Sequence, residues 1–154
     1  MELREQGIDI IKQRIIEDKD ILGLKSIKRN SNQPVNKNKL NAIYIFENED
    51  IITKHASNDF LGYPARRMLE LEIQLISQND RDGKGIKDLF LKLRRTVLCK
   101  KENDIYIPEP TLIDNVFVRE LKTIGAGTYE IPELIGMKMI LGLHYIDNFN
   151  ITEL

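Results

Sequence analysis

The sequence predicts an α+β fold in which a mostly antiparallel four-stranded sheet carries two helices on one of its faces. Two segments repeat apolar residues at helical spacing, and two others alternate apolar and polar residues as half-buried strands do. The predicted elements follow one another in the order helix, strand, strand, helix, strand, strand. The length of 154 residues fits one domain that spans 1–154.

Each predicted helix presents a stripe of apolar side chains. The first helix is expected over residues 2–19 and the second over residues 86–99. The stripes consist of Leu3, Ile8, Ile11 and Ile15 in the first helix and of Ile86, Leu89, Phe90, Leu93 and Val97 in the second. A stripe of this kind predicts that both helices lie against the sheet.

The clearest strand pattern is the run Leu69–Leu75, where leucine and isoleucine alternate with Glu70, Glu72 and Gln74. A strand with one polar face is typical of an antiparallel sheet, because parallel strands are usually buried on both faces. The other three strands are predicted at Asn41–Phe46, Val116–Ile124 and Ile135–Tyr145.

Polar composition and turn residues predict where the chain leaves the sheet. Residues 26–38, rich in Asn, Ser and Lys, and residues 54–66 are expected to be flexible loops, and residues 147–154 a tail. Gly125–Thr128 is expected to form the turn between the last two strands.

The composition argues against several classes of protein. Lysine and arginine number 23 against 24 aspartates and glutamates, and this balance disfavours a protein that tracks a phosphate backbone. The single cysteine, Cys99, excludes a disulfide within the chain and fits a reducing, cytoplasmic setting. No apolar run approaches the ~20 residues that cross a bilayer, so no membrane partner is expected.

The chemistry-bearing residues do not form a recognisable catalytic or metal-binding motif. His55 and His144 lie in different elements, neither belongs to a ligand pair, and Cys99 stands alone. The sequence therefore predicts no metal site, no cofactor and no catalytic residues. For His144 the pattern favours a solvated or partner-facing side chain over a base.

Two glycine-containing segments call for comparison with phosphate-binding loops. Gly125-Ala126-Gly127 lacks the third glycine of a dinucleotide loop and leads into a strand, which favours a hairpin turn. Asp82–Gly85 precedes a helix but lacks the first glycine and the Ser/Thr of a P-loop. A generic anion contact at that helix start stays open as an alternative.

Glu70 and Glu72 could serve as paired carboxylates, but acid–base work requires two carboxyls in different environments. Both are expected on the solvated face of one strand, where charged residues commonly keep a sheet soluble or prevent its aggregation. The four arginines in two short clusters are expected to contact a partner or to form salt bridges, since few aromatics accompany them. These arginines are Arg66, Arg67, Arg94 and Arg95.

The layout of the chain resembles the tail terminator (tail completion) proteins of long-tailed bacteriophages. The residues that carry the resemblance are the run Arg67–Leu75, the helix Ile86–Cys99 that follows it, and the closing strand Ile135–Tyr145. The resemblance covers most of the chain but rests on layout, because this family has no short diagnostic motif.

The resemblance implies a structural protein of the virion, found at the junction of tail and neck and assembled in the host cytoplasm. Members of the family form a ring, typically a hexamer, that caps the completed tail tube and offers a surface for joining the head. The implied partners are further copies of the chain, the tail tube protein, a neck or head-completion protein and, in contractile tails, the sheath protein. DNA would pass through the lumen without being read.

The resemblance also implies an interface. In this family the long loop between the first two strands commonly faces the tube, which points here to Asp59, Tyr63, Arg66 and Arg67. The polar side of the closing strand adds two more predicted interface residues, Lys138 and His144.

Three alternatives to a terminator stay open on the sequence alone. One is another phage part, such as a neck, head-closure or baseplate subunit. The second is an RNA- or DNA-binding α+β module, which would be expected to begin with a strand and to show aromatics on its sheet. The third is an enzyme that uses Glu70 or Glu72.

Overall fold

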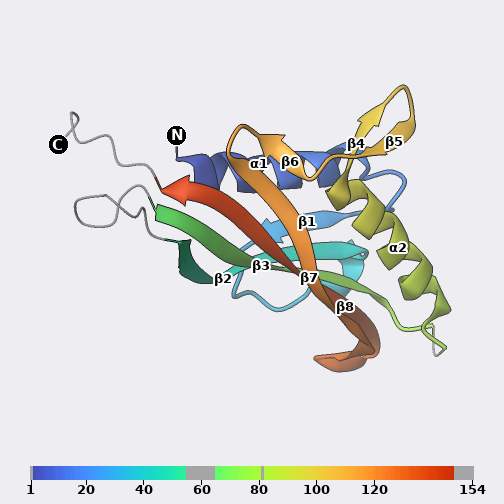
Figure 1. Ribbon diagram of the computed structural model, residues 1–154. Helices are drawn as coiled ribbons and strands as arrows, with labels where there is room; N and C mark the ends of the chain where they lie inside the picture. The colour runs from blue at the N-terminus through green and yellow to red at the C-terminus, as the bar shows by residue number, and fades with distance from the viewer. Residues whose placement is uncertain (1, 55–64, 81, 148–154) are drawn as a thin grey trace.

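The computed structural model describes residues 2–54, 65–80 and 82–147. It contains a six-stranded sheet in the order β1-β2-β3-β8-β7-β6, a separate two-stranded sheet of β4 and β5, and two long helices (Figure 1). The helices are α1 (Leu3–Glu17) and α2 (Lys84–Leu98), and Lys37–Lys39 forms a short 3-10 turn. The strands are β1 (Ser26–Arg29), β2 (Ala42–Lys54), β3 (Ala65–Gln78), β4 (Cys99–Glu102), β5 (Ile105–Pro108), β6 (Thr111–Ile113), β7 (Val116–Tyr129) and β8 (Ile131–Asp147).

The predicted fold class, built on a mostly antiparallel four-stranded sheet, is therefore wrong. The main sheet has six strands, and it is mixed because β1 runs parallel to β2 while the other pairs are antiparallel. A second sheet, the hairpin β4–β5, stands apart from it. The protein is thus richer in strands than the sequence pattern indicates.

The strands that the prediction missed are short. β1 has four residues, β6 has three, and β4 and β5 have four each, too few to display a clear alternation. β1 lies in the polar segment 26–38 that is predicted to be a flexible loop. Whether the rest of that segment is flexible stays a prediction, and residues 55–64 and 148–154 lie outside the described residues.

The turn predicted at Gly125–Thr128 is also wrong, because these residues continue β7. The register between β7 and β8 shifts between Ile124 and Gly127, so the glycines mark an irregularity within the strand pair. The chain reverses instead at Glu130, whose φ of 59° lies in the left-handed region.

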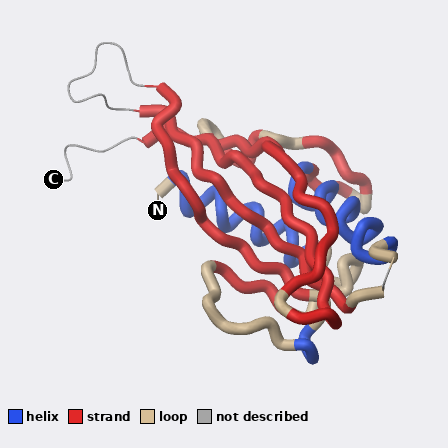
Figure 2. Tube along the Cα trace, turned by 90° about the horizontal axis from the view of Figure 1, so that it is seen from below, coloured by secondary structure: helices blue, strands red, loops and turns tan. Residues whose placement is uncertain are grey.

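Both helices cover the same face of the six-stranded sheet (Figure 2). Alternate residues of β3 and β8 point to that face, and they join the apolar stripes of α1 and α2 in one buried cluster. The central residues of this core are Ile8, Ile11, Ile15, Ile43, Ile45, Leu69, Leu71, Ile73, Leu75, Phe90, Leu93, Met139, Leu141 and Leu143.

Helix α1 approaches the sheet closely at Gly7. A Cβ atom on this residue would lie 2.9 Å from Leu143 Cδ1 and 3.0 Å from Val116 Cγ1. Glycine weakens the interior of a helix, by about 1 kcal/mol relative to alanine. Here it lets the backbone of α1 pack against the side chains of β7 and β8.

A smaller cluster lies on the opposite face, at one end of the sheet. Ala42, Tyr44, Ile76 and Leu134 are buried there, and Val35 and Leu40 pack against them. The segment before β2 therefore folds under the sheet and gives the helix-free face a core of its own.

A buried carboxylate joins α1 to the other helix and to the small hairpin. Asp18, only 2% exposed, accepts hydrogen bonds from Thr96 Oγ1 at 2.5 Å, Tyr106 Oη at 2.8 Å and Lys101 Nζ at 3.1 Å. The guanidinium of Arg95 lies 3.9 Å from the centre of the Tyr106 ring. One aspartate thus fixes α2, β4 and β5 against the end of α1.

Burial alone would raise the pKa of the Asp18 carboxyl, but the hydrogen bonds from Thr96, Tyr106 and Lys101 outweigh burial and lower it. A carboxyl whose pKa is lower in the folded than in the unfolded state stabilises the fold above its unfolded pKa. That stabilisation is lost as the pH falls through the folded pKa.

We expect Asp18→Asn to lower the free energy of unfolding by about 2 kcal/mol at pH 7, since charged hydrogen bonds contribute about 1.5–3 kcal/mol. Urea unfolding monitored at pH 7 and at about pH 3 would measure it. The loss should shrink at the lower pH, where the native carboxyl itself is becoming protonated. Asp20→Asn, an exposed neighbour, is the matched control and should change little. Equal losses at both pH values would contradict a charged Asp18.

Candidate functional site

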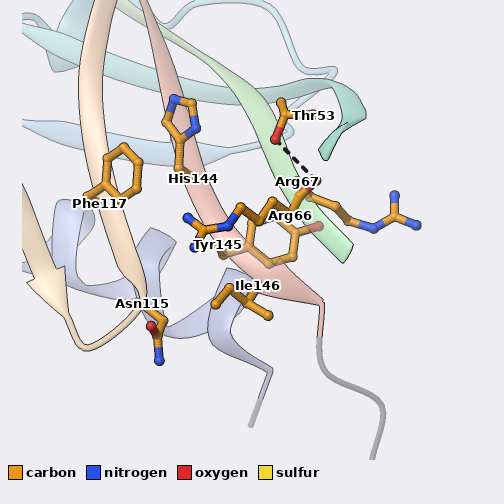
Figure 3. Close-up of a pocket in the computed structure, with 8 residues that line it drawn as sticks. All are labelled: Thr53, Arg66, Arg67, Asn115, Phe117, His144, Tyr145 and Ile146. Atoms are coloured by element: carbon orange, nitrogen blue, oxygen red, sulfur yellow. Dashed lines mark hydrogen bonds between the residues drawn. The ribbon is translucent and has the colours of Figure 1, made fainter. Parts of the chain in front are cut away.

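A small pocket lies at the end of the sheet where β3 begins and β8 ends (Figure 3). Its volume is about 200 Å³. The residues that line it are Thr53, Arg66, Arg67, Asn115, Phe117, His144, Tyr145 and Ile146. They come from β2, β3 and β8 and from the start of β7 with the turn before it, so strand pairing brings together residues far apart in the sequence.

Three of the predicted interface residues meet at this pocket. In the pairing of β3 with β8, Arg66 lies opposite Ile146, Arg67 opposite Tyr145, and Met68 opposite His144. Arg66, Arg67 and His144 therefore occupy neighbouring cross-strand positions. Because successive residues of a strand point to opposite faces, the two arginines diverge from each other.

The two arginines differ in their surroundings. Arg66 is exposed, and its carbonyl accepts a hydrogen bond from Thr53 Oγ1 at 3.2 Å. The Arg67 side chain is 21% exposed, and its Nη1 lies 3.9 Å from Asp50 Oδ1. Arg66 is thus available to an external partner, whereas Arg67 belongs to a charged cluster within the protein.

That charged cluster connects the start of α1 with β1 and β2. Arg4 contacts Glu47 at 2.8 Å and Asp50 at 2.9 Å, and Arg29 contacts Glu47 at 2.9 Å. Arg29 also binds both carboxylate oxygens of Glu5, at 2.7 and 2.9 Å. Paired Arg–carboxylate contacts of this geometry are stronger than single contacts between exposed charges.

Contacts within the cluster favour the ionised forms of Arg29, Glu5 and Glu47. Hydrogen bonds to Glu5 and Glu47 raise the pKa of Arg29, although burial opposes this, and the hydrogen bond from Arg29 lowers the pKa of Glu5. Burial would raise the pKa of Glu47, but hydrogen bonds from Arg4, Asn30 and Arg29 lower it. Arg29, Glu5 and Glu47 satisfy one another, whereas Asp50 Oδ1 is buried without a hydrogen-bond partner among the described residues. Apart from that atom, this is the arrangement of a structural cluster.

Tyr145 connects this cluster to the pocket. Its hydroxyl donates a hydrogen bond to Asp50 Oδ2. Burial and this contact with Asp50 raise the pKa of Tyr145 well above its ordinary value, so the phenol stays protonated. A phenol held in this way supports β8 and is not an acid or base near neutral pH.

His144 lies on the helix-free face of the sheet, where its ring stacks on Phe117. The two ring centres are 4.5 Å apart and the planes are within 5° of parallel. Its Nε2 is buried and has no hydrogen-bond partner among the described residues. Burial, and to a smaller extent the charge of Arg119, lower the pKa of the imidazole, so the ring is neutral at pH 7.

Of the other predicted interface residues, Lys138 is the one within the described ranges, and it does not line the pocket. Lys138 is half-buried and lies opposite Gln74 on β3, six residues along β8 from His144, or roughly 20 Å at the rise of a strand. Asp59 and Tyr63 lie outside the described residues. Of the four predicted residues that the structure describes, three meet at the pocket and Lys138 lies apart from them.

The remaining chemical candidates lack the geometry of a site. Glu72 is half-buried and accepts a hydrogen bond from the buried Gln74, and Glu70 is half-buried as well, so among the described residues the two carboxyls have similar exposure and not the contrasting environments of an acid–base pair. At the start of α2 the carboxylate of Asp80 accepts hydrogen bonds from the N–H groups of Gly83 and Gly85, at 2.9 and 2.8 Å. Those amides are therefore already occupied within the chain, which argues against an anion contact there.

Residues 2–54, 65–80 and 82–147 contain no group of three His, Cys, Asp or Glu side chains that could hold a metal ion. Over the same residues no helix is long and apolar enough to cross a membrane.

Sequence reasoning missed several residues that shape this end of the sheet, among them Asp50, Asn115 and Phe117. The acidic run Glu47–Asp50 was visible directly after a predicted strand, but its arginine partners lie far away in the sequence. Only the strand pairing reveals that Phe117 stacks on His144.

Comparison with known proteins gives a fold relationship and no family. No protein-family model matches the sequence, and no curated protein matches it either. Among the solved structures with a matching fold is a chain of the structure described as "Virion of native gene transfer agent (GTA) particle". The TM-score is 0.53 at 11% sequence identity, and the match covers 88% of this chain and 91% of that chain. At this identity the likeness shows a shared fold.

We expect His144 to titrate below its ordinary pKa of 6.5, which an NMR titration of the imidazole resonances would measure. Phe117→Ala should move the pKa of His144 back toward 6.5 because it removes the ring that covers the imidazole. A lowered folded pKa also means that stability decreases as the pH falls through about 6.5, and His144→Gln should abolish that component. A pKa of His144 at or above 6.5 would contradict a neutral imidazole covered by Phe117.

Proposed function

We propose that this protein is a non-enzymatic structural component of the virion of a tailed phage or phage-like particle. The observation that carries the proposal is the fold that it shares with a chain of a gene transfer agent virion. That likeness extends over 88% of this chain and 91% of the other, so it concerns the whole architecture and not a single motif.

The geometry of the pocket supports a role other than catalysis. A volume of about 200 Å³ is below the roughly 300–1,000 Å³ of ordinary small-molecule sites. Its tyrosine is held by Asp50, its histidine is neutral and stacked on Phe117, and Arg67 faces Asp50. These groups hold the strands in place and leave Arg66 directed to the outside.

Within the virion we propose the role of a tail terminator. Copies of the chain would form a ring, six in number by analogy, that caps the completed tail tube, stops its polymerisation and offers a surface for the neck or head-completion protein. The end of β2 and the start of β3 support such a contact, since Ile51 and Ile52 are each 43% exposed beside the exposed Arg66. In a contractile tail the last sheath ring would be a further neighbour, and DNA would pass through the lumen.

Deletion of the gene in the phage or phage-like particle that carries it, followed by electron microscopy of lysates, tests the proposal. Overlong tails of variable length, separate from filled heads, are expected for a terminator. Tails of normal length beside unjoined or leaking heads would assign the protein to the neck. Fully assembled, infectious particles would overturn the structural role.

A single substitution tests the proposed tube-facing end. We expect Arg66→Glu to reduce capping of tails severalfold, counted as the fraction of tails with normal length after complementation of the deletion. Thermal unfolding should be unchanged, because Arg66 is exposed and its described contact uses the backbone carbonyl.

Lys92→Glu is the matched control, since it reverses an exposed charge on α2 at a distance from this end. Normal tails with Arg66→Glu, at wild-type protein levels, would remove Arg66 from the interface. Loss of capping with Lys92→Glu as well would show a general effect of charge.

A further inference from the structure

The outward face of α2 is basic. Six exposed side chains fall, at about 100° per residue, within an arc of about 140° and along roughly 16 Å of helix. Four of these side chains are cations, and Asp88 is the one acid among them. The residues, which we call the α2 face, are Lys84, Lys87, Asp88, Leu91, Lys92 and Arg95.

The three lysines of the α2 face have no carboxylate partner among the described residues. The arginines beside them are engaged within the protein. Arg94, on the flank of the same helix, contacts Glu120 at 2.8 Å. The guanidinium of Arg95 lies 3.9 Å from the centre of the Tyr106 ring. The lysine charges are therefore not balanced by a contact inside the described chain and are available to an external partner.

An apolar side chain stands among these charges. Leu91 is 58% exposed. The opposite side of α2 is buried in the core through Phe90, Leu93 and Val97, so the helix is held with Leu91 turned outward. A leucine exposed to water gains free energy when an apolar group covers it. The α2 face thus combines a basic border with an apolar centre, as protein interfaces do, on an element that the core holds in place.

The composition of the α2 face favours an acidic protein segment over a nucleic acid. A phosphate backbone would engage the lysines, but it would be repelled by Asp88 and would leave Leu91 without an apolar contact. The whole chain also lacks the basic surplus of a protein that binds phosphates, with a net charge of -1. An acidic segment that carries an apolar side chain engages both the lysines and Leu91.

The α2 face lies far from the end of the sheet that contains Arg66. Arg66 stands at the start of β3, whereas α2 begins six residues after β3 ends at Gln78. Figure 1 shows α2 on the opposite side of the molecule from the start of β3 and the end of β8. A protein that joins two structures needs two surfaces that face apart. With Arg66 at the proposed tube-facing end, the side of α2 is left for the second structure.

We propose that the α2 face is the docking surface for an acidic segment of the protein that this chain joins to the tail tube. Carboxylates of that partner contact Lys84, Lys87 and Lys92, and an apolar side chain of the partner covers Leu91. Charge complementarity selects the partner and speeds the encounter, while the buried contact at Leu91 slows dissociation. The inference rests on the proposed function for the identity of the joined structure, whereas the recognition chemistry follows from the α2 face itself.

A synthetic peptide tests the recognition chemistry on the full-length protein. The probe is a helical peptide of about 20 residues in which glutamates flank a stripe of leucines. Binding is measured by fluorescence anisotropy and located by NMR shifts of the backbone amides. We expect the amides of α2 to shift and those around Arg66 to stay in place. Exchange of the leucines of the peptide for alanine should weaken binding severalfold, because Leu91 then lacks an apolar cover.

Substitutions on the α2 face should have graded effects on binding of this peptide. Lys84→Glu combined with Lys87→Glu is expected to weaken it by at least about tenfold, and Leu91→Ser severalfold. The matched control is Lys25→Glu combined with Lys28→Glu, which changes the net charge equally at two other exposed lysines and should stay within about twofold of the wild type. Each variant should keep the thermal midpoint of the wild type, because the substituted side chains are exposed.

Several outcomes would overturn the docking surface. One is a lack of peptide binding, and another is a set of shifts that maps outside α2. Binding that ignores both Leu91→Ser and the loss of the leucines, or tighter binding of a DNA duplex of about 20 base pairs, would make the α2 face a phosphate-binding surface instead. Self-association of the wild type in analytical ultracentrifugation that Lys84→Glu with Lys87→Glu abolishes would make a second copy the occupant.

In the particle, the same double variant separates the inference from the function on which it rests. After complementation of the deletion, Lys84→Glu with Lys87→Glu should give tails of normal length that stay separate from filled heads. Lys92→Glu should likewise leave the length of the tails normal. Joined, infectious particles with the double variant at wild-type protein levels would overturn the α2 face as the joining surface and leave the terminator role standing. Tails of normal length in the deletion strain itself would overturn the terminator role, whatever the peptide binds.

Discussion

The pairing of β3 with β8 determines the arrangement of everything else in this protein. All 14 residues of β3 pair with β8 without a register shift, whereas the pairings of β2 with β3 and β7 with β8 contain irregularities. A slip of one residue would move every apolar side chain of a strand to the other face. The uninterrupted central pair therefore fixes which side chains form the core beneath α1 and α2, and it sets Arg66 and His144 at the same end of the sheet.

Two polar clusters fix the position of α1 along the sheet, which the apolar core alone leaves undetermined. The arginines and carboxylates around Glu47 and Asp50 hold the start of α1 against β1 and β2, while Asp18 holds the other end of α1 against α2 and the hairpin β4–β5. Apolar packing sets the depth of a helix on a sheet but tolerates sliding along it. Charged contacts at both ends of α1 remove that freedom, because their geometry is satisfied in only one position.

The sequence predicts the long elements well and the edges of the sheet poorly. The alternation over Leu69–Leu75 and the stripe through Phe90 and Leu93 arise from burial, so they appear in the pattern of residues. β1 and β6 are formed by pairing with strands that are already in place, and a strand of three or four residues carries too little periodicity to be recognised. For that reason the predicted fold class is wrong although most of the core residues are visible in the sequence.

The candidate site, like the fold, was predictable where it depends on residue type and unpredictable where it depends on strand pairing. Arg66, Arg67 and His144 could be singled out by residue type, and the structure brings them to one pocket. Arg67 contacts Asp50, and His144 stacks on Phe117. These contacts determine the chemistry of both side chains, but the sequence could not predict them, because only the register of the sheet brings the paired residues together. Lys138 was singled out from its place on the same strand and lies well away from the pocket.

The close approach of Gly7 to Leu143 has a consequence for how the protein comes into being during translation. Helix α1 is made early, whereas β8, one of the elements against which its buried side packs, is made after nearly all the rest of the domain. Contacts between such distant segments form late and slow folding, and until they form, the part of α1 around Gly7 lacks its cover. A nascent chain therefore cannot complete the core of its sheet before β8 leaves the ribosome.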